Sequence, residues 1–128
     1  MLDMLVREEE DKEKYEEACK KIFNMHEKIR FVGILDSNGK LIAGGMREGI
    51  EPLEDEIHEK RWFHQTAIRR EMTTMFENIY GKVRYVFANR EKVKQLTFYI
   101  DDKILFISVQ PEVSAHETID LAEAILKS

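Results

Sequence analysis

The segment HEKRW, residues 58–62, comes within one residue of a zinc-protease motif. In HExxH, two histidines four residues apart share one face of a helix and hold zinc, and the glutamate acts as general base. Here Trp62 stands where the second histidine belongs, and His64 falls on a different helical face. Glu54 and His58 do have a spacing of four, which leaves a weak metal site as a minor alternative. We therefore predict no catalytic metal, no cofactor and no enzymatic activity.

The sequence GGMREG, residues 44–49, is the second candidate for chemistry. It lacks both GxxxxGK[ST] and GxGxxG, so neither phosphate-binding loop is expected. Gly44 and Gly45 suit the end of a strand and a change of chain direction. A small-anion pocket at this loop, with Arg47 contacting the anion, remains an alternative. In that case the protein would be a ligand-sensing domain.

Composition and charge favour one globular domain over residues 1–128. Hydrophobic residues make up 43% of the chain and charged residues 35%, with a net charge of −5. The charges of both signs are interspersed, which disfavours nucleic acid or an anionic membrane as the main partner. A local basic cluster on and around a predicted strand is typical of a guard against edge-to-edge pairing. This cluster consists of Lys82, Arg84, Arg90, Lys92 and Lys94.

Cysteine usage and the lack of long apolar runs favour a cytoplasmic protein. Cys19 is the single cysteine, and its place on the apolar side of a predicted helix favours a buried hydrophobe over a reactive thiol. No apolar run reaches the ~18 residues of a membrane span. Residues 1–14 are either the start of the first helix or a flexible extension, because EEEDKEK has no apolar side.

The elements that must position these groups follow from hydrophobic spacing and turn chemistry. In FVGILDSNGKLIAGG, residues 31–45, a turn made by Asp36 to Gly39 separates two apolar runs and predicts a β-hairpin. Ser114 and Glu117 form a capping box that begins the last helix. The remaining expected elements are helices over 11–28 and 52–80 and strands over 83–88, 93–100 and 104–109.

The long predicted helix over 52–80 carries two apolar stripes, whereas a helix with one buried face needs only one. The second stripe is either the contact with another chain or lies under the two terminal helices. Methionines such as Met72 and Met75 are most simply core filler. The first stripe is Ile57, Ile68, Met72, Met75 and Ile79. The second is Trp62, Phe63, Phe76 and Tyr80, interleaved with Thr66, Arg69 and Thr73.

Together the elements predict an α+β fold in the order α-β-β-α-β-β-β-α, with a five-stranded antiparallel sheet, one long central helix and two terminal helices. This order, the hairpin GILDSNGKLIA and the closing strand DDKILFISV resemble roadblock/LC7 domains, and more loosely the longin and profilin-like group. The segment GKLIAGGMREGIEPL is also similar to a small group of archaeal proteins of unassigned function.

The resemblance implies an interaction module. Roadblock domains dimerise through the long helix and the adjacent strand and serve as platforms for small GTPases or motor components. Carried onto this chain, it implies a scaffold that pairs with itself or a related subunit, with a small GTPase as a candidate partner. The interface would draw on Trp62, Thr66, Arg69, Thr73, Val83 and Tyr85.

Overall fold

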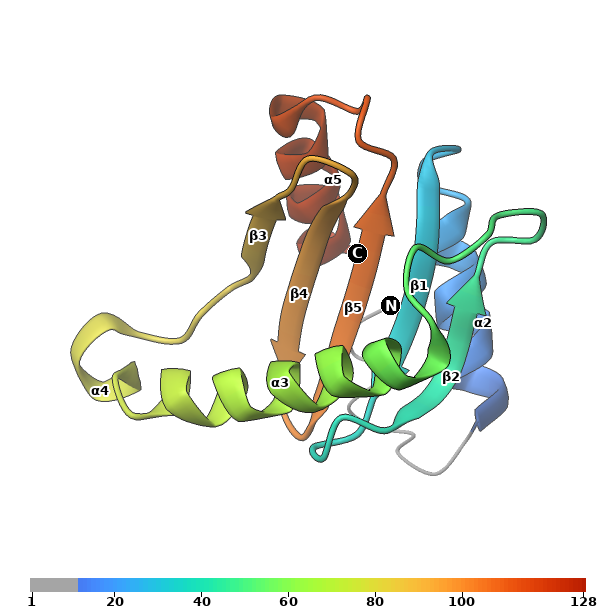
Figure 1. Ribbon diagram of the computed structural model, residues 1–128. Coiled ribbons are helices and arrows are strands. Elements are labelled where there is room, and N and C mark those ends of the chain that lie inside the picture. The colour runs from blue at the N-terminus through green and yellow to red at the C-terminus, as the bar shows by residue number, and fades with distance from the viewer. Residues whose placement is uncertain (1–11) are drawn as a thin grey trace.

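The computed structural model describes residues 12–128 and confirms the predicted α+β order (Figure 1). Residues 1–11 of the expected extension lie outside the described part, and residues 12–14 belong to the first helix. The strands are β1 (Ile29–Leu35), β2 (Leu41–Met46), β3 (Val86–Asn89), β4 (Lys94–Ile100) and β5 (Lys103–Val109). The helices are α2 (Lys12–Phe23), α3 (Glu56–Thr74), α4 (Glu77–Tyr80) and α5 (Ala115–Lys127).

The five strands form one antiparallel sheet in the order β2-β1-β5-β4-β3. Helices α2 and α5 both lie behind the sheet, α2 against β1 and β2 and α5 against β4, and α3 crosses its front at one end (Figure 1). The back face holds the larger core, where side chains such as Ile34, Leu105 and Ile107 are fully buried beneath the two helices. The front core beneath α3 is smaller and largely aromatic.

The β1–β2 hairpin turn forms as its sequence predicts. The carboxylate Oδ1 of Asp36 accepts hydrogen bonds from the backbone N–H groups of Asn38 and Lys40, both at 2.9 Å. Gly39 has φ +86°, a left-handed conformation that favours glycine. The turn also packs against α3, since a β-carbon on Gly39 would lie 2.5 Å from the carbonyl oxygen of Phe63. Gly39 therefore sets how closely α3 approaches the hairpin.

Helix α3 starts later and ends earlier than predicted. It begins at Glu56 rather than Pro52, because the Asp55 carboxylate caps it by accepting the His58 N–H at 2.8 Å. This hydrogen bond lowers the pKa of Asp55. The helix ends at Thr74, where the Thr73 and Thr74 hydroxyls donate to carbonyl oxygens three residues earlier. Such bonds compete with helical ones, and a short helix, α4, follows before Gly81 stops it.

Within α3 the second stripe packs on the sheet and the first stripe is exposed, whereas Phe76 and Tyr80 of the second stripe are exposed as well. Phe63, Thr66 and Ala67 pack on the sheet, with Thr66 only 3% exposed. Met72 and Met75, expected as core filler, are 60% and 74% exposed. The ring of Phe63 packs against those of Phe31 and Phe106, so this side of the helix is the one that faces the sheet. Periodicity shows that a helix has two apolar sides but cannot rank them.

We predict that Gly39→Ala is strongly destabilising. The positive φ alone costs a non-glycine residue about 1–3 kcal/mol, and contact with the Phe63 carbonyl adds to it. Gly49→Ala is the matched control, because Gly49 has φ +83° and a β-carbon added there would meet nothing within 4 Å. Urea unfolding of both variants measures the difference. Equal losses of unfolding free energy would contradict the role of Gly39 in seating α3.

Candidate interaction site

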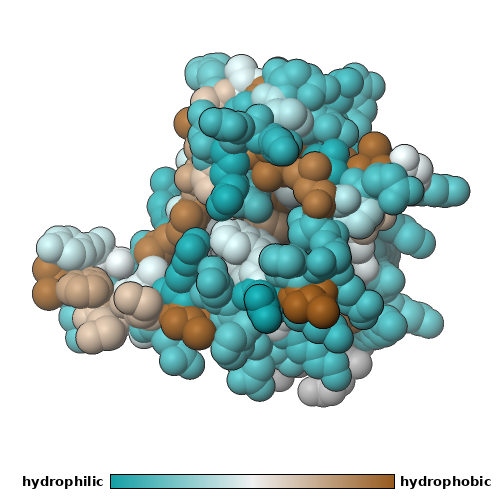
Figure 2. Space-filling model, viewed as in Figure 1, coloured by the Kyte–Doolittle hydropathy of each residue, from teal (hydrophilic) through white to brown (hydrophobic). Residues whose placement is uncertain are grey.

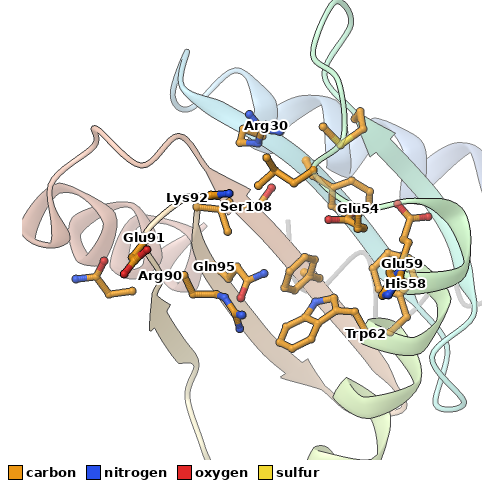
Figure 3. A pocket seen from close by; sticks show the side chains of 17 residues that line it. Arg30, Glu54, His58, Glu59, Trp62, Arg90, Glu91, Lys92, Gln95 and Ser108 are labelled. Atoms are coloured by element: carbon orange, nitrogen blue, oxygen red, sulfur yellow. The ribbon is translucent and has the colours of Figure 1, made fainter.

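A cleft of about 710 Å³ lies on the front of the sheet, between the N-terminal half of α3 and the β3–β4 turn (Figure 3). Its volume is in the range of protein binding sites. The apolar lining residues are Phe31, Met46, Leu53, Trp62, Phe63, Val93 and Phe106. The polar and charged ones are Arg30, Glu54, His58, Glu59, Asn89, Arg90, Glu91, Lys92, Gln95 and Ser108.

The cleft exists because α3 covers only one end of the front face. Along β5 the front-facing side chains run from Ile104 through Phe106 to Ser108, so they become polar where the helix no longer covers them. Along β4, Tyr99 lies in the front core and Gln95 in the cleft. The front face of the sheet is thus apolar at the end that α3 covers and more polar at the other end.

Trp62 forms the aromatic wall of the cleft. Its ring centroid lies 5.8 Å from that of Phe106, in an edge-on arrangement, and the guanidinium of Arg69 lies 5.2 Å from the Trp62 ring. The indole Nε1 of Trp62 and the side-chain oxygen of Gln95 are both buried without a hydrogen-bond partner in the described part of the chain. Buried polar atoms are normally paired, so these two mark a place where a partner group is missing.

The rim of the cleft carries charges of both signs. Arg90, Glu91 and Lys92 lie on the β3–β4 side, and Glu54 and Glu59 on the α3 side (Figure 3). Within residues 12–128 none of these five side chains takes part in an ion pair. Partial burial raises the pKa of Glu59, and the nearby carboxylates of Glu54 and Glu56 raise it further. The rim can therefore accept charged groups from another molecule.

A second feature is an exposed apolar surface on α3 and α4, which we call the tip surface. Helix α3 extends past the edge strand β3, and apolar side chains gather at this protruding end (Figures 1 and 2). The rings of Phe76 and Tyr80 stack there with centroids 6.1 Å apart, and Tyr80 is 81% exposed. The tip surface consists of Ile68, Met72, Met75, Phe76, Ile79 and Tyr80.

The residues predicted for a dimer interface are dispersed by the structure. Thr66 is only 3% exposed because it packs against the sheet of its own chain. Arg69 is exposed and Thr73 half-buried on α3. Val83 and Tyr85 precede β3 rather than lying in it, and the Tyr85 ring packs 5.9 Å from Phe98 in the back core.

The glycine loop does not form the expected anion site. The Nε of Arg47 donates to the carbonyl oxygen of Ile29 at 2.7 Å, and its Nη2 donates to those of Phe23 and His26 at 2.9 and 2.8 Å. The guanidinium therefore closes the connection between α2 and β1. Gly44 donates its N–H to the Glu16 carboxylate, and neither Gly44, Gly45 nor Arg47 lines the cleft. The function based on this loop finds no support.

The other candidates for chemistry have structural roles in residues 12–128. His58 bonds Asp55 through Nδ1 at 2.7 Å, and the described residues hold no group of three His, Cys, Asp or Glu that could bind a metal. Cys19 is buried, which together with Glu16 raises the pKa of its thiol to about 12. In the basic cluster, Lys94 is buried and donates to the Pro111 carbonyl, and Arg84 pairs with Glu123.

The fold defines the class of protein. It is similar to a roadblock/LC7 domain from Streptomyces avermitilis, with a TM-score of 0.61 at 10% identity over 88% of this chain and 91% of that one. It is similar to Myxococcus xanthus MglB, with a TM-score of 0.67 at 14% identity over 92% and 86%. A Schizosaccharomyces pombe profilin gives 0.61 at 12% identity over 88% and 94%. The chain therefore has the roadblock/profilin-like fold that its sequence predicts.

The chain belongs to a family of unknown function, DUF6659, whose model matches residues 7–126. The comparison with curated proteins gives no match. Among the described residues, no helix combines the length and apolar character that a membrane crossing requires.

The cleft as such was missed at the level of sequence, although one signal for it was present. Alternate positions of β4 and β5 change from Tyr99 to Gln95 and from Ile104 to Ser108, which indicates a face that is only half covered. The side chains of Arg30 and Arg90 have no comparable signal. They come from β1 and from the β3–β4 turn, and only the sheet topology brings them to one cleft.

We predict that Arg47→Met lowers the free energy of unfolding by roughly 2–3 kcal/mol, because three carbonyl oxygens lose a charged donor. Thermal unfolding in phosphate and in a phosphate-free buffer is the second measurement. Phosphate should stabilise the wild-type and variant proteins equally. A stabilisation by phosphate that is confined to the wild-type protein would instead support an anion site at Arg47.

We predict that Glu59→Gln stabilises the fold near neutral pH. Folding raises the Glu59 pKa above its ordinary value of 4.5, so the ionised carboxylate is disfavoured in the folded state. The penalty is fully present above the raised pKa and disappears as the pH falls below the ordinary one. Urea unfolding at about pH 7 and about pH 3.5 should show a gain only at the higher pH. Glu48→Gln, at an exposed loop position, is the control and should show no such gain.

Proposed function

We propose that this chain is a non-enzymatic interaction module that self-associates and presents a platform to a partner protein. The observation that carries the proposal is the tip surface: Met72, Met75, Ile79 and Tyr80 are all at least 60% exposed on consecutive turns of α3 and α4. Contiguous exposed apolar side chains of this size are typical of protein–protein contacts. Methionine and aromatic residues are also those that interfaces favour.

The sheet edge beside the tip surface supports self-association. Strand β3 is an edge strand of four residues, and Val86 at its start is 40% exposed. Most soluble homo-oligomers use two-fold symmetry, which brings the same surface of both copies together. Arg69, Thr73 and Val83 lie along the same region and belong to this proposed contact, with Trp62 at its far end. Thr66 contributes to this contact only indirectly, because its side chain packs between α3 and the sheet.

The partner proposed for the platform is a related subunit or a small GTPase, as the roadblock resemblance implies. Ile57 and Ile68 on the outer side of α3 are 63% and 46% exposed and point away from the sheet core. A dimer that uses the tip surface would leave Ile57 accessible on each copy. We expect the protein to be soluble and to act in the cytoplasm.

We predict that the protein is a dimer at micromolar concentration and that Met75→Glu weakens it. A carboxylate buried without a cationic partner at the contact should cost at least about 2 kcal/mol, or roughly thirtyfold in Kd. Size-exclusion chromatography with light scattering gives the mass across a dilution series. Circular dichroism should show an unchanged fold, because Met75 is 74% exposed.

Gln65→Glu is the matched control for this prediction. It places the same carboxylate at an exposed position of α3, about ten residues from Met75 and outside the tip surface. The control should retain the wild-type Kd. A wild-type protein that remains monomeric throughout the series, or a dimer that is equally stable in Met75→Glu, would contradict self-association through this surface.

A further inference from the structure

The cleft beside Trp62 lies open at the end of the front face that α3 does not cover. Its floor and wall contain Phe31, Trp62 and Phe106, and no side chain of the described residues fills its volume of about 710 Å³. An aromatic-walled recess next to two buried polar atoms without partners fits an occupant that is aromatic and carries one polar group.

The tip of α4 has that chemistry. Phe76 and Tyr80 form a stacked pair, 50% and 81% exposed, and α4 lies beyond the edge strand β3 (Figure 1). The tyrosine hydroxyl both donates and accepts hydrogen bonds. It therefore matches the Nε1–H of Trp62, which lacks an acceptor, and the side-chain oxygen of Gln95, which lacks a donor.

The charges beside the two features are also complementary. The β3–β4 turn at the rim of the cleft carries two cations, Arg90 and Lys92, and one carboxylate, Glu91, whereas Glu77 at the start of α4 is acidic. Within the described part of the chain none of these four residues is in an ion pair. Pairing across an interface would bring the Glu77 carboxylate to the two cations of the rim.

The tip cannot enter the cleft of its own chain. Trp62 lies in the N-terminal half of α3 and α4 follows its C-terminal end, and the continuous helix between them keeps the two apart (Figure 1). From Trp62 to Phe76 the chain advances 14 residues, which is about 20 Å along a helix. The occupant must therefore come from another molecule.

We propose that the Phe76–Tyr80 tip of one copy docks in the Trp62 cleft of a second copy, and reciprocally. An antiparallel arrangement of the two α3 helices places the C-terminal end of each beside the N-terminal half of the other. A two-fold axis then makes both contacts at once. This inference rests on the proposed self-association, and it adds the acceptor surface and the contact between Tyr80 and the cleft.

Trp62 provides the test, because it is the single tryptophan of the chain and lines the cleft. Its fluorescence emission and its quenching by acrylamide are measured over the same dilution series as the mass. Docking predicts that emission shifts to shorter wavelength and quenching falls as the dimer forms. Tyr80→Asp should abolish both changes and the dimer. Ile57→Asp, an equal change at an exposed site of α3 outside the cleft lining, should abolish neither.

Cross-linking identifies the two surfaces directly. Asn78→Cys places a thiol on the tip and Lys92→Cys places one on the rim of the cleft, both at exposed positions. A short bismaleimide should join the two variants when they are mixed, and should join neither variant to itself. The buried Cys19 should leave the wild-type chain unlinked.

The outcomes separate this inference from the proposed function. A dimer whose Trp62 fluorescence and quenching do not change with concentration overturns docking in the cleft and leaves self-association intact. Cross-linking of Asn78→Cys with itself, but not with Lys92→Cys, overturns docking in the same way, because the tips then meet each other. A monomer at all concentrations overturns both.

Discussion

The packing of α3 against the front of the sheet is the contact on which the other features of this protein depend. Phe63 and Ala67 of α3 belong to the front core, where the ring centroids of Phe31, Phe63 and Phe106 lie 5.9–6.2 Å from one another. Near the C-terminal end of the helix, Arg70 donates to the Lys103 carbonyl at 2.7 Å. The hairpin turn at Gly39 packs against the N-terminal half of α3. These three contacts, with the aromatic core, the Lys103 carbonyl and the hairpin turn, fix the position of α3 on the sheet.

Two consequences follow from the length and position of α3. Because α3 is longer than the part of the sheet it crosses, its C-terminal end and α4 project past β3 with their apolar side chains uncovered. Because it crosses at one end, the other end of the front face lies open as a cleft. A convex apolar feature and a concave one therefore arise from a single packing arrangement, on the same face of the molecule.

The chemistry of this surface is that of recognition. Its lining combines aromatic rings, two unpartnered polar atoms and charges of both signs, and burial and neighbouring carboxylates raise the pKa of Glu59. The fold is shared with roadblock domains and profilin at identities of 10–14%, so the architecture itself does not select a partner. The side chains on α3, α4 and the β3–β4 turn must do so.

Much of the architecture was predictable from residue types. Alternation along the strands, the Asp36–Gly39 turn and the Ser114 cap are local signals, and the structure confirms each of them. The ends of α3 were misplaced, because the helix begins after the Asp55 cap rather than at Pro52 and because the Thr73–Thr74 pair interrupts a pattern that otherwise looks continuous. The bond network of Arg47 was also beyond prediction, since its three acceptors come from a connection more than fifteen residues away.

By itself, then, the sequence determined the elements, their order and the presence of one more apolar stripe than a single core requires. Those properties depend on neighbouring residues and on helical or strand periodicity, which the chain carries locally. Only the tertiary structure decided which stripe faces the sheet and where the uncovered surfaces lie. Both depend on the shape of side chains that meet across long sequence separations, such as Phe63 with Phe31, and on where along the sheet the helix crosses. Periodicity contains no information about either.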